Sequence, residues 1–322
     1  MDILLTGRWA DDDERDTWLA ALCEAVRPVL PGARWWLDRG EAQPAWPDRI
    51  EIAVVANPLP GRLQGLPRLR LIQSLWAGVD RLLADESLPA SVPIARMVDP
   101  AMNAAMAETA LWAVLTLQRG FHHYAAQQRA GLWRQLPQRR ADELTVTVLG
   151  CGQMGAAAAR RLAAMGYRVR AWRATAGAAA GLAGIEVHAG AEALAPLLAD
   201  SDIVVNLLPL TPATRGLIDA RFLAALPPGA ALVNLARGAH VEEADLLAAL
   251  DSGRLGHAVL DVFATEPLPA SHPFWSHPRV TLLPHVAALT DPRSAATVVA
   301  ANLGALVEGR EIAHRVDRRR GY

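Results

Sequence analysis

Three polar residues in the second half of the chain have the side chains that a hydride-transfer site needs. They are Arg237, Glu266 and His285, and each follows an apolar run. A histidine can give a proton to a ketone oxygen as a hydride reaches the carbon. A carboxylate bonded to its other ring nitrogen fixes the tautomer and favours the imidazolium form. An arginine can hold a substrate carboxylate in a fork and polarise the carbonyl, so this set predicts a reductase site.

Position alone does not single out His285, because the chain contains nine histidines. Most of the others fall in predicted helices, strands or proline-rich loops without an identifiable partner. His240 lies close to Arg237 in the sequence and could border the same site.

A glycine-rich GxGxxG pattern begins at Gly150, after the apolar run Thr145–Leu149 and before a helical pattern. In this setting the first glycine makes a tight turn, the second lets backbone amides approach a pyrophosphate, and the third allows close packing of helix and strand. The helix N-terminus adds a positive field. A purely structural strand-to-helix turn is the alternative. The predicted phosphate-binding residues are Gly150, Gly152, Gln153, Met154 and Gly155.

Arg173 stands about 20 residues past this loop, where NAD-binding folds usually carry an acid for the ribose hydroxyls. An acid there would repel the 2′-phosphate of NADP, whereas an arginine can pair with it bidentately. Thr175 could add a hydrogen bond. The alternative is that Arg173 simply faces water. We expect NADPH as cofactor with NADH as a weaker alternative, because no second basic residue follows directly.

The elements that must position these residues form two successive alternations of strand and helix, which predict parallel sheets. We expect an α/β protein in which a Rossmann-type doubly wound parallel sheet is inserted into a smaller flavodoxin-like domain. The substrate domain is predicted over 1–98 and 291–322, and the dinucleotide-binding domain over 99–290. One long helix is predicted over Ala101–Arg129, and a last helix over Pro292–Val307 is predicted to return to the first domain.

Composition excludes several other classes of protein. The 322 residues carry a formal net charge of −1, which gives no reason to expect a nucleic-acid partner. Apolar runs are too short for a membrane span, and the start does not resemble a signal peptide. Two cysteines fit a reducing cytoplasm, and without CxxC or HExxH patterns we expect no metal.

The chain resembles the D-2-hydroxyacid dehydrogenase family over nearly its whole length, in the family's order. The segments that carry the resemblance are SLWAGVD (74–80), LGCGQMG (149–155), NLLPLTPATRGLI (206–218), LVNLARGAHVEEADLLAALDSG (232–253), LDVFATEPLP (260–269), HPRVTLLPHVAALT (277–290) and VDRRRGY (316–322).

The resemblance implies that Arg237 binds and polarises substrate, Glu266 partners the histidine, and His285 donates the proton. It implies that Asp261 contacts the nicotinamide carboxamide and that Thr214 reaches a phosphate or ribose. The cofactor cleft is expected to be lined by Leu208, Pro209, Leu235, Ala236 and Ala287. It also implies NADPH, a small 2-oxo acid substrate, and a homodimer formed by the long helix and the following loop 131–137.

The substrate loop departs from the family pattern, because Trp76 stands where members usually have glycine. The backbone amides of Trp76, Ala77 and Gly78 are expected to bind the substrate carboxylate as a small anion nest. The indole could close the pocket over a small substrate, replacing a wall lost at Ala56, or it could pack elsewhere and never touch substrate.

The sequence thus predicts NADPH-dependent reduction of glyoxylate to glycolate and of hydroxypyruvate to D-glycerate. The sequence leaves two alternative functions: a dinucleotide-sensing regulatory protein of the same fold, and a dehydrogenase for a bulkier 2-oxo acid.

Overall fold

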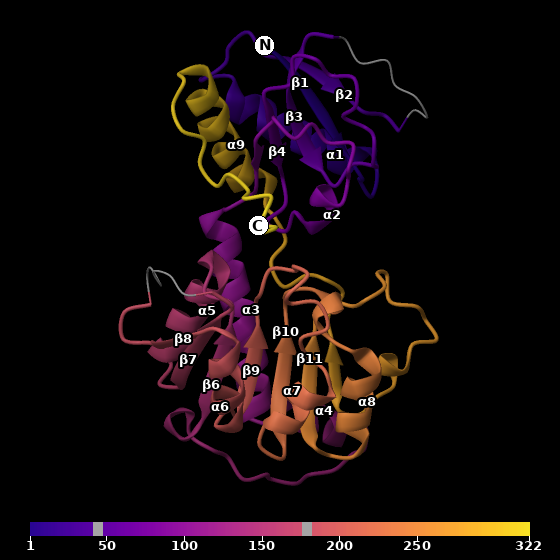
Figure 1. Cartoon of the computed structure of the whole chain (residues 1–322). Helices are drawn as coiled ribbons and strands as arrows, with labels where there is room; N and C mark the ends of the chain where they lie inside the picture. Colours follow the sequence, from indigo (N-terminus) through magenta and orange to yellow (C-terminus); the bar gives the residue numbers. More distant parts are fainter. Residues whose placement is uncertain (41–47, 176–181) are drawn as a thin grey trace. The chain divides into compact units, whose positions relative to one another are not determined.

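The computed structural model describes residues 1–40, 48–175 and 182–322, and the chain divides into two compact units (Figure 1). Unit 1 comprises Met1–Ala101 and Thr290–Tyr322, and unit 2 comprises Met102–Leu289. Unit 2 is therefore one continuous insertion in the chain of unit 1. Each unit is built on one parallel sheet, which confirms the predicted α/β class.

Unit 1 has a five-stranded sheet in the order β2-β1-β3-β4-β5, the order of flavodoxin-like folds. Its elements are β1 (Asp2–Gly7), α1 (Asp12–Val26), β2 (Arg34–Leu37), β3 (Ile50–Ala56), β4 (Leu71–Ser74), α2 (Asp80–Leu83), β5 (Ile94–Ala95) and α9 (Pro292–Val307).

Helices α1 and α9 pack against each other although some 270 residues separate them in the sequence. The side chain of Asp11 caps α1 by accepting a hydrogen bond from the Glu14 amide at 2.8 Å. Asp291 caps α9 in the same way, and Pro292 occupies its first turn, where a missing N–H costs nothing. Helix α9 has the range predicted from the sequence and belongs to unit 1.

Unit 2 has a seven-stranded sheet in the order β12-β11-β10-β9-β6-β7-β8, which contains the dinucleotide-binding strand order. Its strands are β6 (Thr145–Leu149), β7 (Arg168–Arg173), β8 (Glu186–Ala189), β9 (Ile203–Asn206), β10 (Ala230–Asn234), β11 (Leu255–Leu260) and β12 (Val280–Leu282). Its helices are α3 (Pro100–Gln118, starting in unit 1), α4 (Phe121–Arg129), α5 (Gln153–Ala164), α6 (Leu194–Ala199), α7 (Ala220–Ala225) and α8 (Glu243–Asp251), with short 3-10 turns η1 (Ala141–Glu143), η2 (Ala191–Ala193), η3 (Gly238–His240) and η4 (Pro273–Trp275).

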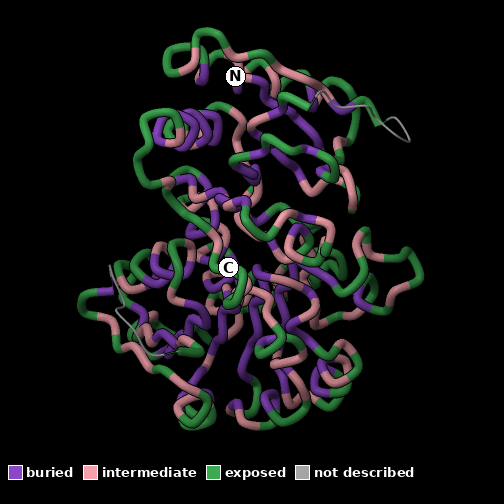
Figure 2. Tube along the Cα trace, turned by 45° about the horizontal axis from the view of Figure 1, so that its top comes forward, coloured by how far each residue is buried: buried purple, intermediate pink, exposed green. Residues whose placement is uncertain are grey.

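All residues of the central strands β6 and β10 of the unit 2 sheet are buried, and Figure 2 shows these residues in purple. One face, with Val146 and Val148, packs against α3 and α5. The other, with Val204 and Leu232, packs against α6, α7 and α8. Alternate residues of the strands therefore enter different cores, which explains their near-continuous apolar runs.

The single long helix predicted over Ala101–Arg129 is wrong. Helix α3 ends at Gln118, and Gly120 takes a left-handed φ of 65° before α4 begins. Glycine reaches this conformation at little cost, so it terminates one helix and starts the next in a new direction. Within the described part of the chain, no helix combines the length and apolar character needed to cross a membrane.

Candidate active site

The glycine loop joins β6 to α5 in the close packing that a dinucleotide pyrophosphate requires. A Cβ on Gly155 would lie 1.8 Å from the carbonyl oxygen of Gly150, so only glycine lets the helix start this near the strand. A Cβ on Gly152, at the N-cap of α5, would meet open space. The N-cap residue Gly152 has no side chain to cap α5, so the first amides of the helix can bind an anion. The loop therefore fits the pyrophosphate of a dinucleotide.

Arg173 is the last residue of β7, directly beside this loop. Strand β7 pairs with β6, and the Gly150 amide donates to the Trp172 carbonyl at 2.8 Å. Burial raises the pKa of the Cys151 thiol, while the positive charge of Arg173 acts in the opposite direction. Arg173 is therefore close enough to the loop to place positive charge at its rim. Thr175 follows as an exposed residue.

The loop after β9 is held by its own hydrogen bonds. Thr214 is 3% exposed, and its hydroxyl donates to the Pro209 carbonyl at 2.7 Å and accepts from the Thr211 amide at 2.9 Å. The Thr214 hydroxyl thus helps to shape this loop, and its expected contact with a phosphate or ribose stays a prediction. Leu208 is buried and donates its amide to Asn206 Oδ1 at 3.2 Å.

Arg237 follows β10 after the buried pair Leu235 and Ala236. Its guanidinium donates to the Ala236 carbonyl at 2.7 Å. A Cβ on the next residue, Gly238, would lie 1.8 Å from the carbonyl carbon of Phe263. The backbone of the Arg237 turn is therefore in direct contact with the backbone of the loop that carries Glu266.

His285 and Glu266 form the predicted pair. His285 Nδ1 lies 2.8 Å from Glu266 Oε2, and Glu266 Oε1 accepts from the Phe263 amide at 3.0 Å. The carboxylate is thus fixed at both oxygens, and the ring of His285 is held with Nε2 directed away from the pair. This is the arrangement in which a carboxylate stabilises an imidazolium that gives up its other proton.

Asp261 holds the backbone that carries His285. Its own carbonyl accepts from the His285 amide at 2.8 Å, and its carboxylate accepts from Val286 and Ala287 at 2.7 and 3.1 Å. His285 has a φ of 55°, which is unusual for a residue with a side chain. Burial raises the pKa of Asp261, although both amides and the charge of His285 oppose the rise. Asp261 therefore fixes a strained backbone, a role the sequence did not reveal.

In unit 1, the loop Trp76–Gly78 follows β4. The Trp76 amide donates to Ser74 Oγ at 3.0 Å, so one of the three amides predicted to form an anion nest is already engaged. The indole of Trp76 meets that of Trp18 edge to face, with centroids 5.9 Å apart. Packing on α1 therefore holds the Trp76 ring.

No group of three or more metal-binding side chains occurs among the residues that the structure describes. The sequence also gave little notice of Asn206 and Asn234, whose buried side chains link the ends of β9 and β10. The one available signal was their position, because each is the last, polar residue of an apolar strand.

A glycine phosphate loop and a histidine–carboxylate pair on one dinucleotide-type sheet define a nicotinamide-dependent oxidoreductase. The family model described as D-isomer specific 2-hydroxyacid dehydrogenase, NAD binding domain, matches residues 111–287. The chain belongs to this family.

Similar proteins cover all or nearly all of its length. Glyoxylate/hydroxypyruvate reductase A of Serratia proteamaculans is 42% identical over 312 residues, 95% of this chain and 96% of the relative. A D-isomer specific 2-hydroxyacid dehydrogenase from Xanthobacter autotrophicus Py2, solved with NADPH and MES, superposes with a TM-score of 0.91 at 40% identity and covers 100% and 99% of the two chains. An NADPH-dependent glyoxylate/hydroxypyruvate reductase from Sinorhizobium meliloti, solved with NADP and sulfate, gives 0.89 at 34% identity, with coverage of 100% and 99%.

Asp261→Asn tests the hold on His285. The Asp261 carboxylate accepts from two backbone amides, one at each oxygen. An asparagine side chain has only one acceptor oxygen, so one of these hydrogen bonds is lost and the new NH2 group faces a backbone N–H. We expect kcat to fall by on the order of tenfold or more and the free energy of unfolding by about 1–3 kcal/mol. Steady-state kinetics and urea unfolding measure the two effects.

Asp245→Asn is the matched control, because Asp245 Oδ2 also accepts from a backbone amide, that of Ala220 at 2.9 Å, at the surface of the same unit. Its kcat should match the wild type. A folded Asp261→Asn protein with unchanged kcat would refute the role of Asp261.

Proposed function

We propose that this protein reduces small 2-oxo acids with NADPH, converting glyoxylate to glycolate and hydroxypyruvate to D-glycerate. The observation that carries the proposal is the His285–Glu266 hydrogen bond, 2.8 Å long, on the sheet that bears the glycine loop. The names of the relatives support the choice of substrates, and the NADPH and NADP in two similar structures support the cofactor.

Each member of the polar set has one proposed task. NADPH, when bound, supplies the hydride. Arg237 binds the carboxylate of the 2-oxo acid and draws electron density from the carbonyl. His285 donates the Nε2 proton to the carbonyl oxygen, and Glu266 stabilises the imidazolium before the transfer. Proton donation and carbonyl polarisation both offset the negative charge that develops on this oxygen.

The cofactor site draws on the edge of the unit 2 sheet. We propose that the amides at Gly152–Gly155 bind the pyrophosphate and that Arg173, aided by Thr175, pairs with the 2′-phosphate. Asp261, already bonded to two amides, retains lone pairs that can accept from the nicotinamide carboxamide. The apolar lining comes from Leu208, Pro209, Leu235, Ala236 and Ala287.

In unit 1 we propose that the amides of Ala77 and Gly78 form a site for a small anion such as a carboxylate. Trp76 packs on Trp18 of α1, and we propose that its indole, at a position where the family usually has glycine, limits the size of the substrate.

A substrate panel tests the activity directly. Purified protein should turn over glyoxylate and hydroxypyruvate with NADPH faster than pyruvate or phenylpyruvate. His285→Ala should lower kcat by about 100-fold to 10,000-fold, because it removes the proton donor. Its NADPH dissociation constant, measured by fluorescence titration, should stay at the wild-type value.

Near-normal turnover by His285→Ala would reject the mechanism. A preference for phenylpyruvate would favour the dehydrogenase for a bulkier substrate. Failure of every 2-oxo acid, with tight NADPH binding, would favour the dinucleotide-sensing regulator.

Arg173→Asp tests the cofactor preference. The new carboxylate repels the 2′-phosphate and can accept from ribose hydroxyls, so kcat/KM for NADPH should fall on the order of tenfold to 100-fold while NADH use is kept or improved. Arg168→Asp, the same reversal at the exposed start of β7, should leave the ratio unchanged. Equal losses with both cofactors in Arg173→Asp would contradict the assignment.

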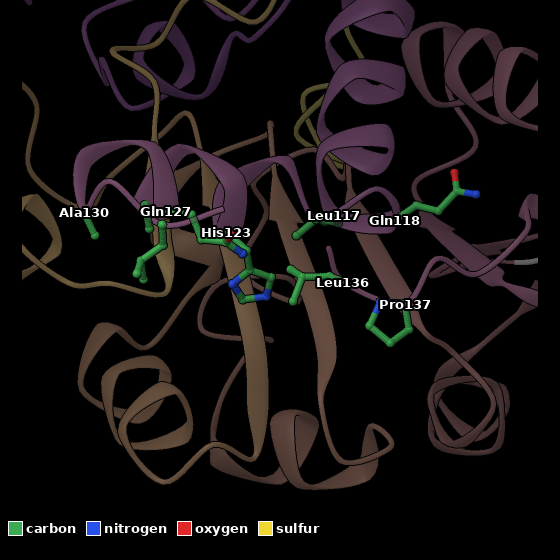
Figure 3. A pocket seen from close by; sticks show the side chains of 10 residues that line it. Leu117, Gln118, His123, Gln127, Ala130, Leu136 and Pro137 are labelled. Carbon is green, nitrogen blue, oxygen red and sulfur yellow. The ribbon is translucent and has the colours of Figure 1, made fainter. Parts of the chain in front are cut away.

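We also propose a homodimer formed through α4 and the stretch that follows it. None of the nine residues of α4 is buried, and Leu132 and Trp133 are 63% and 99% exposed. Next to them lies a hollow of about 620 Å³, in which Figure 3 shows His123, Leu117 and Leu136 close together. Its lining comprises Leu117, Gln118, Gly120, His123, Ala126, Gln127, Ala130, Leu132, Leu136 and Pro137. A projecting indole beside a hollow on one surface is the self-complementary pattern of a two-fold interface.

Trp133→Glu tests this surface. A charge at the centre of an apolar interface should shift the protein from dimer to monomer in sedimentation velocity at micromolar concentration. Trp275→Glu, which alters another exposed tryptophan, should remain dimeric. A wild-type protein that sediments as a monomer would rule out the proposed dimer.

A further inference from the structure

Three fully buried polar side chains bond to one another at the ends of β9 and β10. Asn206, Asn234 and His240 are each 0% exposed. The Asn206 Nδ2 donates to Asn234 Oδ1 and to His240 Nδ1, both at 3.0 Å. Burial of such groups costs free energy unless each is hydrogen-bonded, so an apolar core would be the simpler solution here. None of the three has a task in the reaction proposed above.

Backbone amides identify the oxygen of each asparagine. The Leu208 amide donates to Asn206 Oδ1 at 3.2 Å, and the Ala236 amide donates to Asn234 Oδ1 at 3.3 Å. A backbone N–H cannot pair with an amide NH2, so neither side chain can be turned over. The nitrogens therefore face their partners as donors.

These orientations determine the state of the His240 ring. Because Asn206 Nδ2 only donates, His240 Nδ1 accepts. His240 Nε2 lies 3.3 Å from the Pro209 carbonyl, which only accepts, so Nε2 carries the hydrogen. A second ring proton would set two donors against each other at Nδ1. His240 is therefore neutral and held in a single tautomer.

Two hydrogen bonds of this network hold the backbone of Arg237. The Arg237 carbonyl accepts from Asn234 Nδ2 at 3.0 Å and from the His240 amide at 3.3 Å. The His240 ring ties the same turn to the Pro209 loop. Since Gly238 of this turn touches Phe263, a shift of the turn would also reach the loop of Glu266.

We propose that His240 is a positioning residue for the reaction: its neutral ring joins the Pro209 loop to the Arg237 turn and thereby aims the Arg237 guanidinium at the substrate carboxylate. This inference rests on the proposed role of Arg237. It assigns His240 no contact with substrate or cofactor, and it predicts that its effect on catalysis passes through Arg237.

A double-mutant cycle measures that dependence. His240→Leu should raise KM for glyoxylate on the order of tenfold while the NADPH dissociation constant changes less than about threefold, because Arg237 is misaimed. In an Arg237→Lys background, which has lost the fork, the same substitution should change KM less than about twofold. Additive losses in the cycle would overturn the proposal.

A graded variant guards against a folding defect. In His240→Asn the amide oxygen takes the place of Nδ1 and keeps the Asn206 bond, but the donor to Pro209 is lost. Its KM should fall between those of the wild type and His240→Leu. A wild-type KM in this variant would show that the bond from the His240 ring to the Pro209 carbonyl contributes nothing, and it would overturn the inference.

His257→Leu is the matched control. His257 is also a buried histidine of unit 2, 4% exposed and bonded to Thr281 Oγ1 at 2.9 Å, but it lies towards the opposite end of its strand, paired with Ala231. Its loss should change the unfolding midpoint without changing KM. If His240→Leu and His257→Leu lower stability equally, a larger KM effect of His240→Leu supports the proposal, and equal KM effects overturn it.

The single variant Arg237→Lys distinguishes a failure of the proposed role of Arg237 from a failure of the proposed role of His240. Wild-type KM and kcat in this variant would reject the proposed role of Arg237, and with it the role of His240. An impaired Arg237→Lys combined with an additive cycle would reject only the role of His240.

Discussion

The proposed catalytic residues of unit 2 leave its sheet at the edge where the parallel strands end. The register of these strands is the constraint on which this arrangement depends. Leu149 pairs with Asn206, Asn206 with Asn234, and Asn234 with Leu260. These residues form one row across the sheet, so the residues that follow them leave the sheet at the same edge. Asp261 is one of these. A slip of one residue would turn every such side chain to the other face, and no later packing could restore the set.

Beyond that row, the polar groups are held mainly by backbone hydrogen bonds. Phe263 fixes Glu266, and Asp261 fixes the main chain at His285 and at the two residues that follow it. Groups that are bound before substrate arrives need no reorganisation as charge develops on the reacting oxygen. The cost of fixing these groups is met once, during folding, and the left-handed backbone of His285 is part of that cost.

Local sequence was sufficient for the fold class and for the pairing of Glu266 with His285. The glycine spacing specifies a close strand-to-helix turn, and polar residues that end apolar strands must meet at one edge because the strands are parallel. The caps at Asp291 and Pro292 likewise defined α9. The error at α3 and α4 arose because apolar residues continue through the break, although Gly120 was a local signal for it.

Long-range contacts could not be predicted in this way. The Asn206–His240 bond joins residues 34 positions apart, and the edge-to-face contact of Trp18 with Trp76 joins two different elements of unit 1. Periodicity says which face of an element is buried, but it does not say which side chains meet there. Whether the Trp76 amide is available to a ligand depends on the Ser74 hydroxyl, whose orientation is a property of the folded loop.

The packing of α1 against α9 also affects the order in which the two units can fold during synthesis. Unit 2 is continuous, so it can complete its sheet as soon as Leu289 has emerged. Unit 1 begins first, yet the part of α1 that packs on α9 stays uncovered until α9 is synthesised. The inserted unit therefore acquires its structure earlier than the unit that surrounds it, and the first hundred residues are the part of the nascent chain most in need of protection from aggregation.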